Sequence, residues 1–159
     1  MPSITPCLWF DGRAEEAARF YTDLFPNSKI TNVIRAPGSG TPGNEPGSVV
    51  MVQFTLEGQP FAGLNGGPQF TFTEAVSFQV HVADQAEVDR YWDAFTDGGE
   101  PGVCSWCKDR FGLSWQVVPA RLLELLGDPD PERSQRAFNA MMSMTKIDLA
   151  AVEAAVNSG

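Results

Sequence analysis

The sequence has little of several residue types on which whole classes of function depend. It contains a single histidine, His81, which excludes a metal site built from two imidazoles and a carboxylate. It has 11 lysines and arginines against 20 aspartates and glutamates, a formal net charge of −9. Because such an acidic chain repels nucleic-acid phosphates and anionic lipid headgroups, we expect no nucleic-acid partner.

Long apolar runs and a paired set of cysteines are also missing. No run of about 18 apolar residues is present, so we expect no membrane-spanning segment and no membrane partner. Residues 1–11 lack the basic start and the apolar stretch of a secretory signal. The three cysteines cannot all pair within one chain, which is more typical of a reducing compartment than of a disulfide framework. We therefore expect a cytoplasmic protein.

The sequence does contain enough apolar residues, 43% of the total, to build a core. Alternating and helical periodicities predict one strand, one helix and three strands in the first half, at residues 4–10, 13–25, 29–35, 49–56 and 60–65. The same order recurs in the second half, at residues 76–82, 84–96, 100–103, 105–108 and 113–118. Three further helices are predicted at residues 121–126, 131–144 and 147–156.

These elements predict an α+β fold made of two β-α-β-β-β modules with antiparallel-rich sheets. The modules span residues 1–68 and 75–119, and a helical tail spans residues 120–159. The length is typical of one domain or of two small similar halves, and we expect the modules to form one structural domain overall. We expect Met141, Met142 and Met144 of the tail to pack against the core or against a second subunit.

One face of the predicted sheets carries uncharged polar side chains. Alternation places Ser77, Gln79 and His81 together on one strand. The same face receives Gln53 and Thr55 from an earlier strand, and Ser114 and Gln116 from the last one. Two interpretations are open. The face is either an ordinary solvated sheet surface or the wall of a ligand cavity that offers amide and hydroxyl groups.

Three other features have both a structural and a chemical interpretation. His81 is a candidate general base, although the sequence indicates no acidic residue beside it. The simpler interpretation is a hydrogen-bonded histidine on the sheet surface. Cys104 and Cys107 have C-x-x-C spacing, but one such pair in short strands is a weak signal for zinc or redox chemistry. Lys108 and Asp109 are expected to form a surface ion pair.

Several motifs resemble those of PhnB-like proteins in the vicinal-oxygen-chelate superfamily, which includes glyoxalases, bleomycin-resistance proteins and dioxygenases. The similar stretches are PCLWFDGRAEEA (6–17), FPNS (25–28), LNGGP (64–68), DQAE (84–87), DGGE (97–100), CSWCKDRFGLSWQ (104–116), QRAF (135–138) and MTKID (144–148). The resemblance implies cupped, glyoxalase-like sheets, a ligand in the cup and a homodimer. It therefore favours the ligand-cavity interpretation of the polar face.

The resemblance also allows the superfamily's metal positions to be carried over. They fall on Thr5, Ser77, Gln116 and the stretch 62–64, none of which is a histidine or an acid. Hydroxyl and amide groups are weak ligands for transition metals, so we expect no metal and no cofactor. Many relatives are described as 3-demethylubiquinone-9 3-methyltransferases. The glycine-rich stretches 36–48 and 64–68 do not lie between a strand and a helix, which argues against a nucleotide-type methyl donor site.

The sequence thus predicts a metal-free, homodimeric small-molecule-binding protein. Its candidate ligand-binding residues are Trp9, Gln53, Asn65, Ser77, Gln79, Cys104, Trp106 and Gln116, and the catalytic residue, if any, is His81. Two alternatives stay open. One is a lyase, isomerase or dioxygenase of the same superfamily with an atypical site. The other is a resistance protein that sequesters a cationic or aromatic drug.

Overall fold

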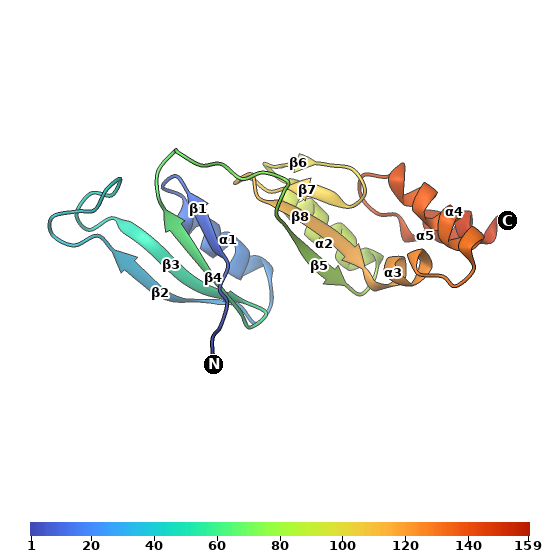
Figure 1. Ribbon diagram of the computed structural model, residues 1–159, viewed down its shortest axis with the longest axis horizontal. Coiled ribbons are helices and arrows are strands. Elements are labelled where there is room, and N and C mark those ends of the chain that lie inside the picture. The colour runs from blue at the N-terminus through green and yellow to red at the C-terminus, as the bar shows by residue number, and fades with distance from the viewer. The chain divides into compact units, whose positions relative to one another are not determined.

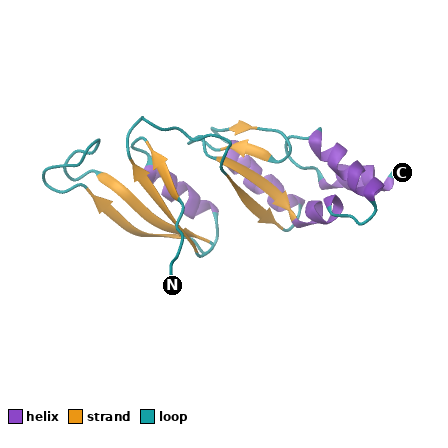
Figure 2. Ribbon diagram, in the orientation of Figure 1, coloured by secondary structure: helices purple, strands orange, loops and turns teal.

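The computed structural model describes all 159 residues and divides into two compact units, Met1–Thr71 and Phe72–Gly159. Each unit holds one four-stranded sheet, and most of the helical residues belong to the second unit (Figures 1 and 2). None of the helices combines the length and the apolar character that crossing a bilayer requires.

The first unit has the order of elements that the sequence predicts for the first β-α-β-β-β module. Its elements are β1 (Cys7–Phe10), α1 (Ala14–Leu24), β2 (Lys29–Arg35), β3 (Val49–Leu56) and β4 (Gln59–Asn65). The strand order is β1-β4-β3-β2, in which only β1 and β4 are parallel. Helix α1 packs on β3 through its small apolar face, and Val52, Phe54 and Leu56 are buried there, as the alternation predicts. Glu57 and Gly58 both have positive φ, which suits the tight turn between β3 and β4.

The second unit repeats this topology. Its sheet elements are β5 (Ser77–Val82), α2 (Gln85–Thr96), β6 (Glu100–Pro101), β7 (Trp106–Lys108) and β8 (Ser114–Pro119). The strand order is β5-β8-β7-β6, and β5 and β8 are the parallel pair. The Asp84 carboxylate accepts a hydrogen bond from Glu87 N and so begins α2. The ring of Phe95 on α2 stacks on Trp115 of β8 with centroids 4.5 Å apart, which joins the helix to the sheet.

The strands β6 and β7 are shorter than the predicted strands 100–103 and 105–108. Cys104 and Ser105 have φ values of +57° and +77°, a left-handed conformation that β-strands do not tolerate. The Trp106 amide donates to the Val103 carbonyl, which closes a tight turn between the two strands. The chain therefore bulges here instead of continuing as a ladder.

Asp109 organises the turn between β7 and β8, and the prediction of a surface Lys108–Asp109 pair is wrong. Asp109 is only 2% exposed, and its Oδ2 accepts a hydrogen bond from Trp115 Nε1 at 2.8 Å. Its Oδ1 accepts from the Phe111 and Leu113 amides at 2.8 and 3.1 Å. Lys108 pairs instead with Glu74. A buried carboxylate persists because these N–H donors replace the water that it lost.

The helical tail consists of α3 (Ala120–Leu126), α4 (Pro131–Met142) and α5 (Leu149–Asn157). It has a small core made of Leu122, Leu125, Ala137, Ile147, Val152 and Val156. Met141 and Met144 pack partly against this core, as expected, whereas Met142 is 66% exposed and does not.

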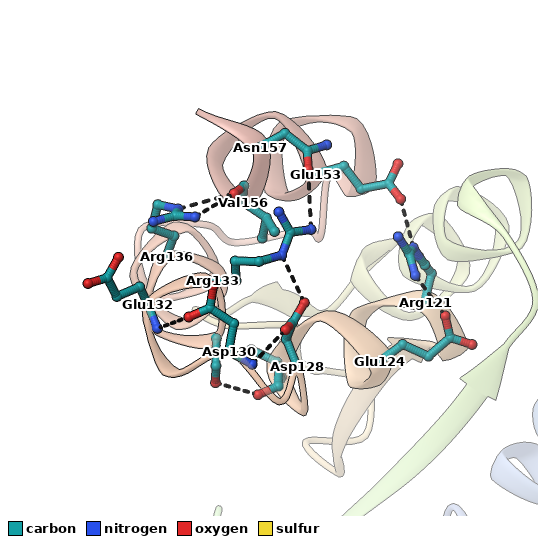
Figure 3. Close-up of polar contacts among 12 residues, drawn as sticks. Arg121, Glu124, Asp128, Asp130, Glu132, Arg133, Arg136, Glu153, Val156 and Asn157 are labelled. Atoms are coloured by element: carbon teal, nitrogen blue, oxygen red, sulfur yellow. Dashed lines mark hydrogen bonds and ion pairs between the residues drawn. The ribbon is translucent and has the colours of Figure 1, made fainter. Parts of the chain in front are cut away.

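Polar contacts at the rim of this core hold the three helices together (Figure 3). Arg121 of α3 pairs with Glu124 and, across to α5, with Glu153. Arg136 of α4 donates two hydrogen bonds to the Val156 carbonyl near the end of α5. These charge-assisted bonds satisfy a carbonyl that the helix end leaves unpaired.

Replacing Asp109 with alanine tests the role of the buried carboxylate. We expect D109A to lower the free energy of unfolding by about 3 kcal/mol, because three N–H donors then lose their acceptor in a buried site. Urea denaturation followed by tryptophan fluorescence measures this loss. The control is D97A, which removes an exposed carboxylate and should change stability by less than about 0.5 kcal/mol. Equal losses in the two variants would contradict the assignment.

Candidate functional site

The polar face of the second sheet is held by a chain of side-chain hydrogen bonds. The strand register places Gln79 opposite Gln116 and Gln116 opposite Trp106. Gln79 Nε2 donates to Gln116 Oε1 at 3.3 Å, and Gln116 Nε2 donates to Ser77 Oγ at 2.8 Å. The structure therefore brings three of the candidate residues, Ser77, Gln79 and Gln116, into direct contact. His81 is exposed one step further along β5, beside Val118.

A cavity of about 540 Å³ opens beside this chain, and we name it the Trp106 cavity. It is lined by Glu74, Glu100, Pro101, Gly102, Val103, Cys104, Trp106, Cys107, Lys108 and Ser114. The lining is mostly apolar, with a few polar groups, and the volume lies within the range of small-molecule sites. Two sequence-predicted residues, Cys104 and Trp106, belong to it.

Ser114 is the cavity residue whose polar group is not satisfied. It is 1% exposed, and its Oγ has no hydrogen-bond partner. Most buried polar groups in proteins are paired, because an unpaired one costs about 1–3 kcal/mol. The alternation in the sequence placed Ser114 on the polar face. Its burial depends on the two residues that lie opposite it, Lys108 on β7 and Ser77 on β5. No local sequence signal marks Glu74 or Val103 as lining residues.

The wall of the cavity at residues 102–106 is held by the helical tail. Cys104 N donates to Met144 O at 2.8 Å, and Ser105 N donates to Thr145 O at 3.0 Å. Both residues have a left-handed backbone, and these two bonds supply partners for amides that no strand neighbour pairs with.

Gln85 on α2 forms hydrogen bonds with the next residues of the tail. Its Nε2 donates to Ile147 O at 2.8 Å, and its Oε1 accepts from Leu149 N at 2.9 Å. Nearby, Lys146 pairs with Asp89 at 2.9 Å, which raises the pKa of Lys146 and lowers that of Asp89. The segment 144–149 is thus tied both to α2 and to the cavity wall.

The remaining candidates, Trp9, Gln53 and Asn65, lie in the first unit. Trp9 Nε1 donates to Gly67 O at 2.8 Å, and its ring meets Phe70 edge-on. A Cβ at Gly66 would come within 2.3 Å of the Trp9 ring, so only glycine fits there. Gln53 is exposed and accepts a hydrogen bond from Asn32.

Asn65 has a clear structural role. Its Oδ1 accepts from Ala14 N at 2.9 Å, which caps the start of α1, and its Nδ2 donates to Val49 O at 3.0 Å. It also borders a smaller hollow of about 400 Å³, whose other lining residues are Gly12, Glu15, Gly43, Asn44, Glu45, Ser48 and Val49. Because both ends of its amide hold backbone groups, Asn65 has little capacity left for a ligand.

The resemblance maps the superfamily's metal positions to Thr5, Ser77 and Gln116, whose side chains are hydroxyls and an amide. Ser77 Oγ and Gln116 Oε1 already accept hydrogen bonds from neighbouring amides, and hydroxyl and amide oxygens are weak ligands for such ions. Thr5 precedes β1 and is exposed. No group of three or more His, Cys, Asp or Glu side chains is arranged to hold a metal ion.

The two cysteines of the C-x-x-C spacing lie in different environments. Cys104 is partly exposed in the left-handed turn, whereas Cys107 is 2% exposed within β7. Burial, helped by the nearby Asp109 carboxylate, raises the pKa of Cys107 to about 12. At pH 8 the folded protein therefore holds very little Cys107 thiolate.

This difference predicts the pattern of alkylation. Iodoacetamide at pH 8 should modify Cys104 in the folded protein and leave Cys107 unmodified, because the thiolate is the reactive form. Peptide mapping by mass spectrometry identifies the labelled residues. Unfolding in guanidinium chloride is the control, since it should make all three cysteines reactive. Rapid labelling of Cys107 in the folded protein would contradict the expected protection.

Comparisons with known proteins agree with this architecture. The sequence profile of the 3-demethylubiquinone-9 3-methyltransferase family matches residues 2–118, a stretch that ends before α3. A PhnB protein from Bacillus cereus has 36% sequence identity and a TM-score of 0.68, and the match covers 75% of this chain and 100% of that one. Among proteins of curated function, none matches this chain.

More distant solved structures share the fold. The protein PA1353 from Pseudomonas aeruginosa has 20% identity and a TM-score of 0.58, with 75% of this chain and 98% of that one covered. A gene product of Arabidopsis thaliana has 17% identity and a TM-score of 0.50, with 74% and 98% covered. Together with the repeated β-α-β-β-β topology and the profile match, these similarities lead to one conclusion. This chain belongs to the 3-demethylubiquinone-9 3-methyltransferase family of PhnB-like proteins.

Proposed function

We propose that this protein binds a small, mostly apolar molecule, and that the Trp106 cavity is where it does so. The observation that carries the proposal is a cavity of about 540 Å³ that combines an apolar lining, one aromatic side chain and an unsatisfied buried hydroxyl. Apolar walls with a few polar groups are typical of small-molecule sites. The adjoining Ser77–Gln79–Gln116 chain adds amide groups whose positions are already set.

Binding in this proposal does not require a metal ion. The side chains at the superfamily's metal positions are hydroxyls and amides, and two of them are engaged with each other. Literal methyl transfer is also not part of the proposal. Each sheet contains a single parallel strand pair, whereas the doubly wound folds that bind nucleotide-type methyl donors are built on mostly parallel sheets.

We extend the proposal to assembly and location. The family resemblance supports a homodimer, and three cysteines without a disulfide support a reducing compartment such as the cytoplasm. Neither statement is needed for the proposed binding, because the proposed contact groups all belong to one unit of one chain.

Truncating Trp106 tests the site. A neutral aromatic probe, 1-naphthalenemethanol, should bind the native protein, and W106A should weaken this binding by about tenfold or more, since the contact with the indole is lost. Isothermal titration calorimetry measures the dissociation constant. The control is F138A, which removes a partly exposed aromatic ring of α4 that does not line the cavity. The cavity assignment fails if the two variants bind the probe equally well.

Metal removal tests the second part of the proposal. Dialysis against millimolar EDTA should leave the dissociation constant of 1-naphthalenemethanol unchanged, because none of the proposed contacts is a metal ligand. The double variant S77H/Q116E serves as the positive control for the assigned metal positions, and it should gain affinity for Zn²⁺ or Mn²⁺. Loss of probe binding in EDTA, restored by added metal, would refute a metal-independent site.

A further inference from the structure

The lining of the Trp106 cavity carries more negative than positive charge. Lys108 is the one cationic side chain in the lining, and two carboxylates, Glu74 and Glu100, accompany it. Lys108 forms an ion pair with Glu74, and the strand register places Glu100 directly opposite Lys108 on β6. The cation is therefore compensated before any ligand enters.

The pKa shifts of Lys108 and Glu74 are consistent with this ion pair. The bond to Glu74 raises the pKa of Lys108, and the same bond lowers the pKa of Glu74. Counted as formal charges, one lysine and two glutamates give the lining a net charge of −1, in a protein whose overall formal charge is −9. An anionic ligand would meet repulsion both at the cavity and on approach.

The uncharged part of the cavity favours a flat ligand. Trp106 offers an indole surface beside Val103 and Pro101. An indole face attracts both aromatic rings and organic cations, the latter through its ring quadrupole. Ser114 adds a hydroxyl that has no partner within the protein and can either donate or accept a hydrogen bond.

We propose that the Trp106 cavity selects ligands by charge: it takes planar, apolar molecules that are neutral or carry one positive charge, and it rejects anions. Trp106 contacts the flat surface of the ligand. Glu100, whose partner Lys108 is already paired with Glu74, provides the attraction for a cation. Because this selectivity rests on the proposed function, its test must separate failure of charge selection from failure of binding itself.

Three probes that share one naphthalene ring test the charge preference on the full chain. They are 1-naphthylmethylamine, 1-naphthalenemethanol and 1-naphthoate, which are cationic, neutral and anionic at pH 7. We expect the amine and the alcohol to bind at least about tenfold more tightly than the carboxylate, because the naphthalene contacts are the same and the head groups differ chiefly in charge. Calorimetric titration at low salt gives the three dissociation constants. Added salt should weaken binding of the amine and leave that of the alcohol unchanged.

A matched pair of variants assigns the effect to Glu100. E100Q should reduce the preference for the amine over the alcohol by about threefold, whereas E132Q, which removes the same charge from the first turn of α4, should not change it. Naphthoate binding as tightly as the amine would overturn the charge selection while leaving the proposed binding function intact. Absence of binding by all three probes would overturn both.

Discussion

The carboxylate of Asp109 is the interaction on which the candidate site of the second unit depends. It is buried, and it accepts hydrogen bonds from two backbone amides of its own turn and from the indole of Trp115. These bonds hold the β7–β8 hairpin in register, so that Trp106 lies opposite Gln116 and Lys108 lies opposite Ser114. Burial, together with this negative charge, raises the pKa of Cys107. The buried carboxylate thus positions the cavity residues and adds to the effect of burial on a neighbouring thiol.

The polar side chains around the site differ in whether they have hydrogen-bond partners within the protein. Gln116 bonds to both Ser77 and Gln79, so these three side chains leave fewer hydrogen-bonding groups that depend on water. The hydroxyl of Ser114, by contrast, is buried without a partner. In the proposed binding function, a ligand that supplies this missing hydrogen bond gains affinity over one that does not.

The helical tail contributes to the site although it lies beyond the stretch that the family profile matches. Its own core of aliphatic side chains fixes the three helices together, and Gln85 fastens the segment before α5 to α2. From that position Met144 and Thr145 offer carbonyls to Cys104 and Ser105, whose left-handed backbone shapes the cavity wall. The tail is therefore part of the structure that defines the cavity, and its packing offsets the strain in the turn.

Periodicity was sufficient to predict the elements and their faces. The alternation of Val52, Phe54 and Leu56, and of Leu113, Trp115 and Val117, identified the buried faces of both sheets, because successive strand residues point to opposite sides. The repeated order of elements and the motif resemblance predicted two modules of the glyoxalase-like kind. The short β6 and β7 could not be predicted, since two consecutive left-handed residues other than glycine have no compositional signal.

Some features of the candidate site also follow from the sequence, and others do not. The sequence by itself determined which residues share the polar face, the scarcity of imidazoles and the excess of negative charge. Only the tertiary structure decided that Asp109 is buried, that Asn65 caps α1 and that Lys108 pairs with Glu74. Local patterns report which way a side chain faces. Burial and pairing depend on residues that are distant in the chain and become neighbours only when the sheet and helices pack.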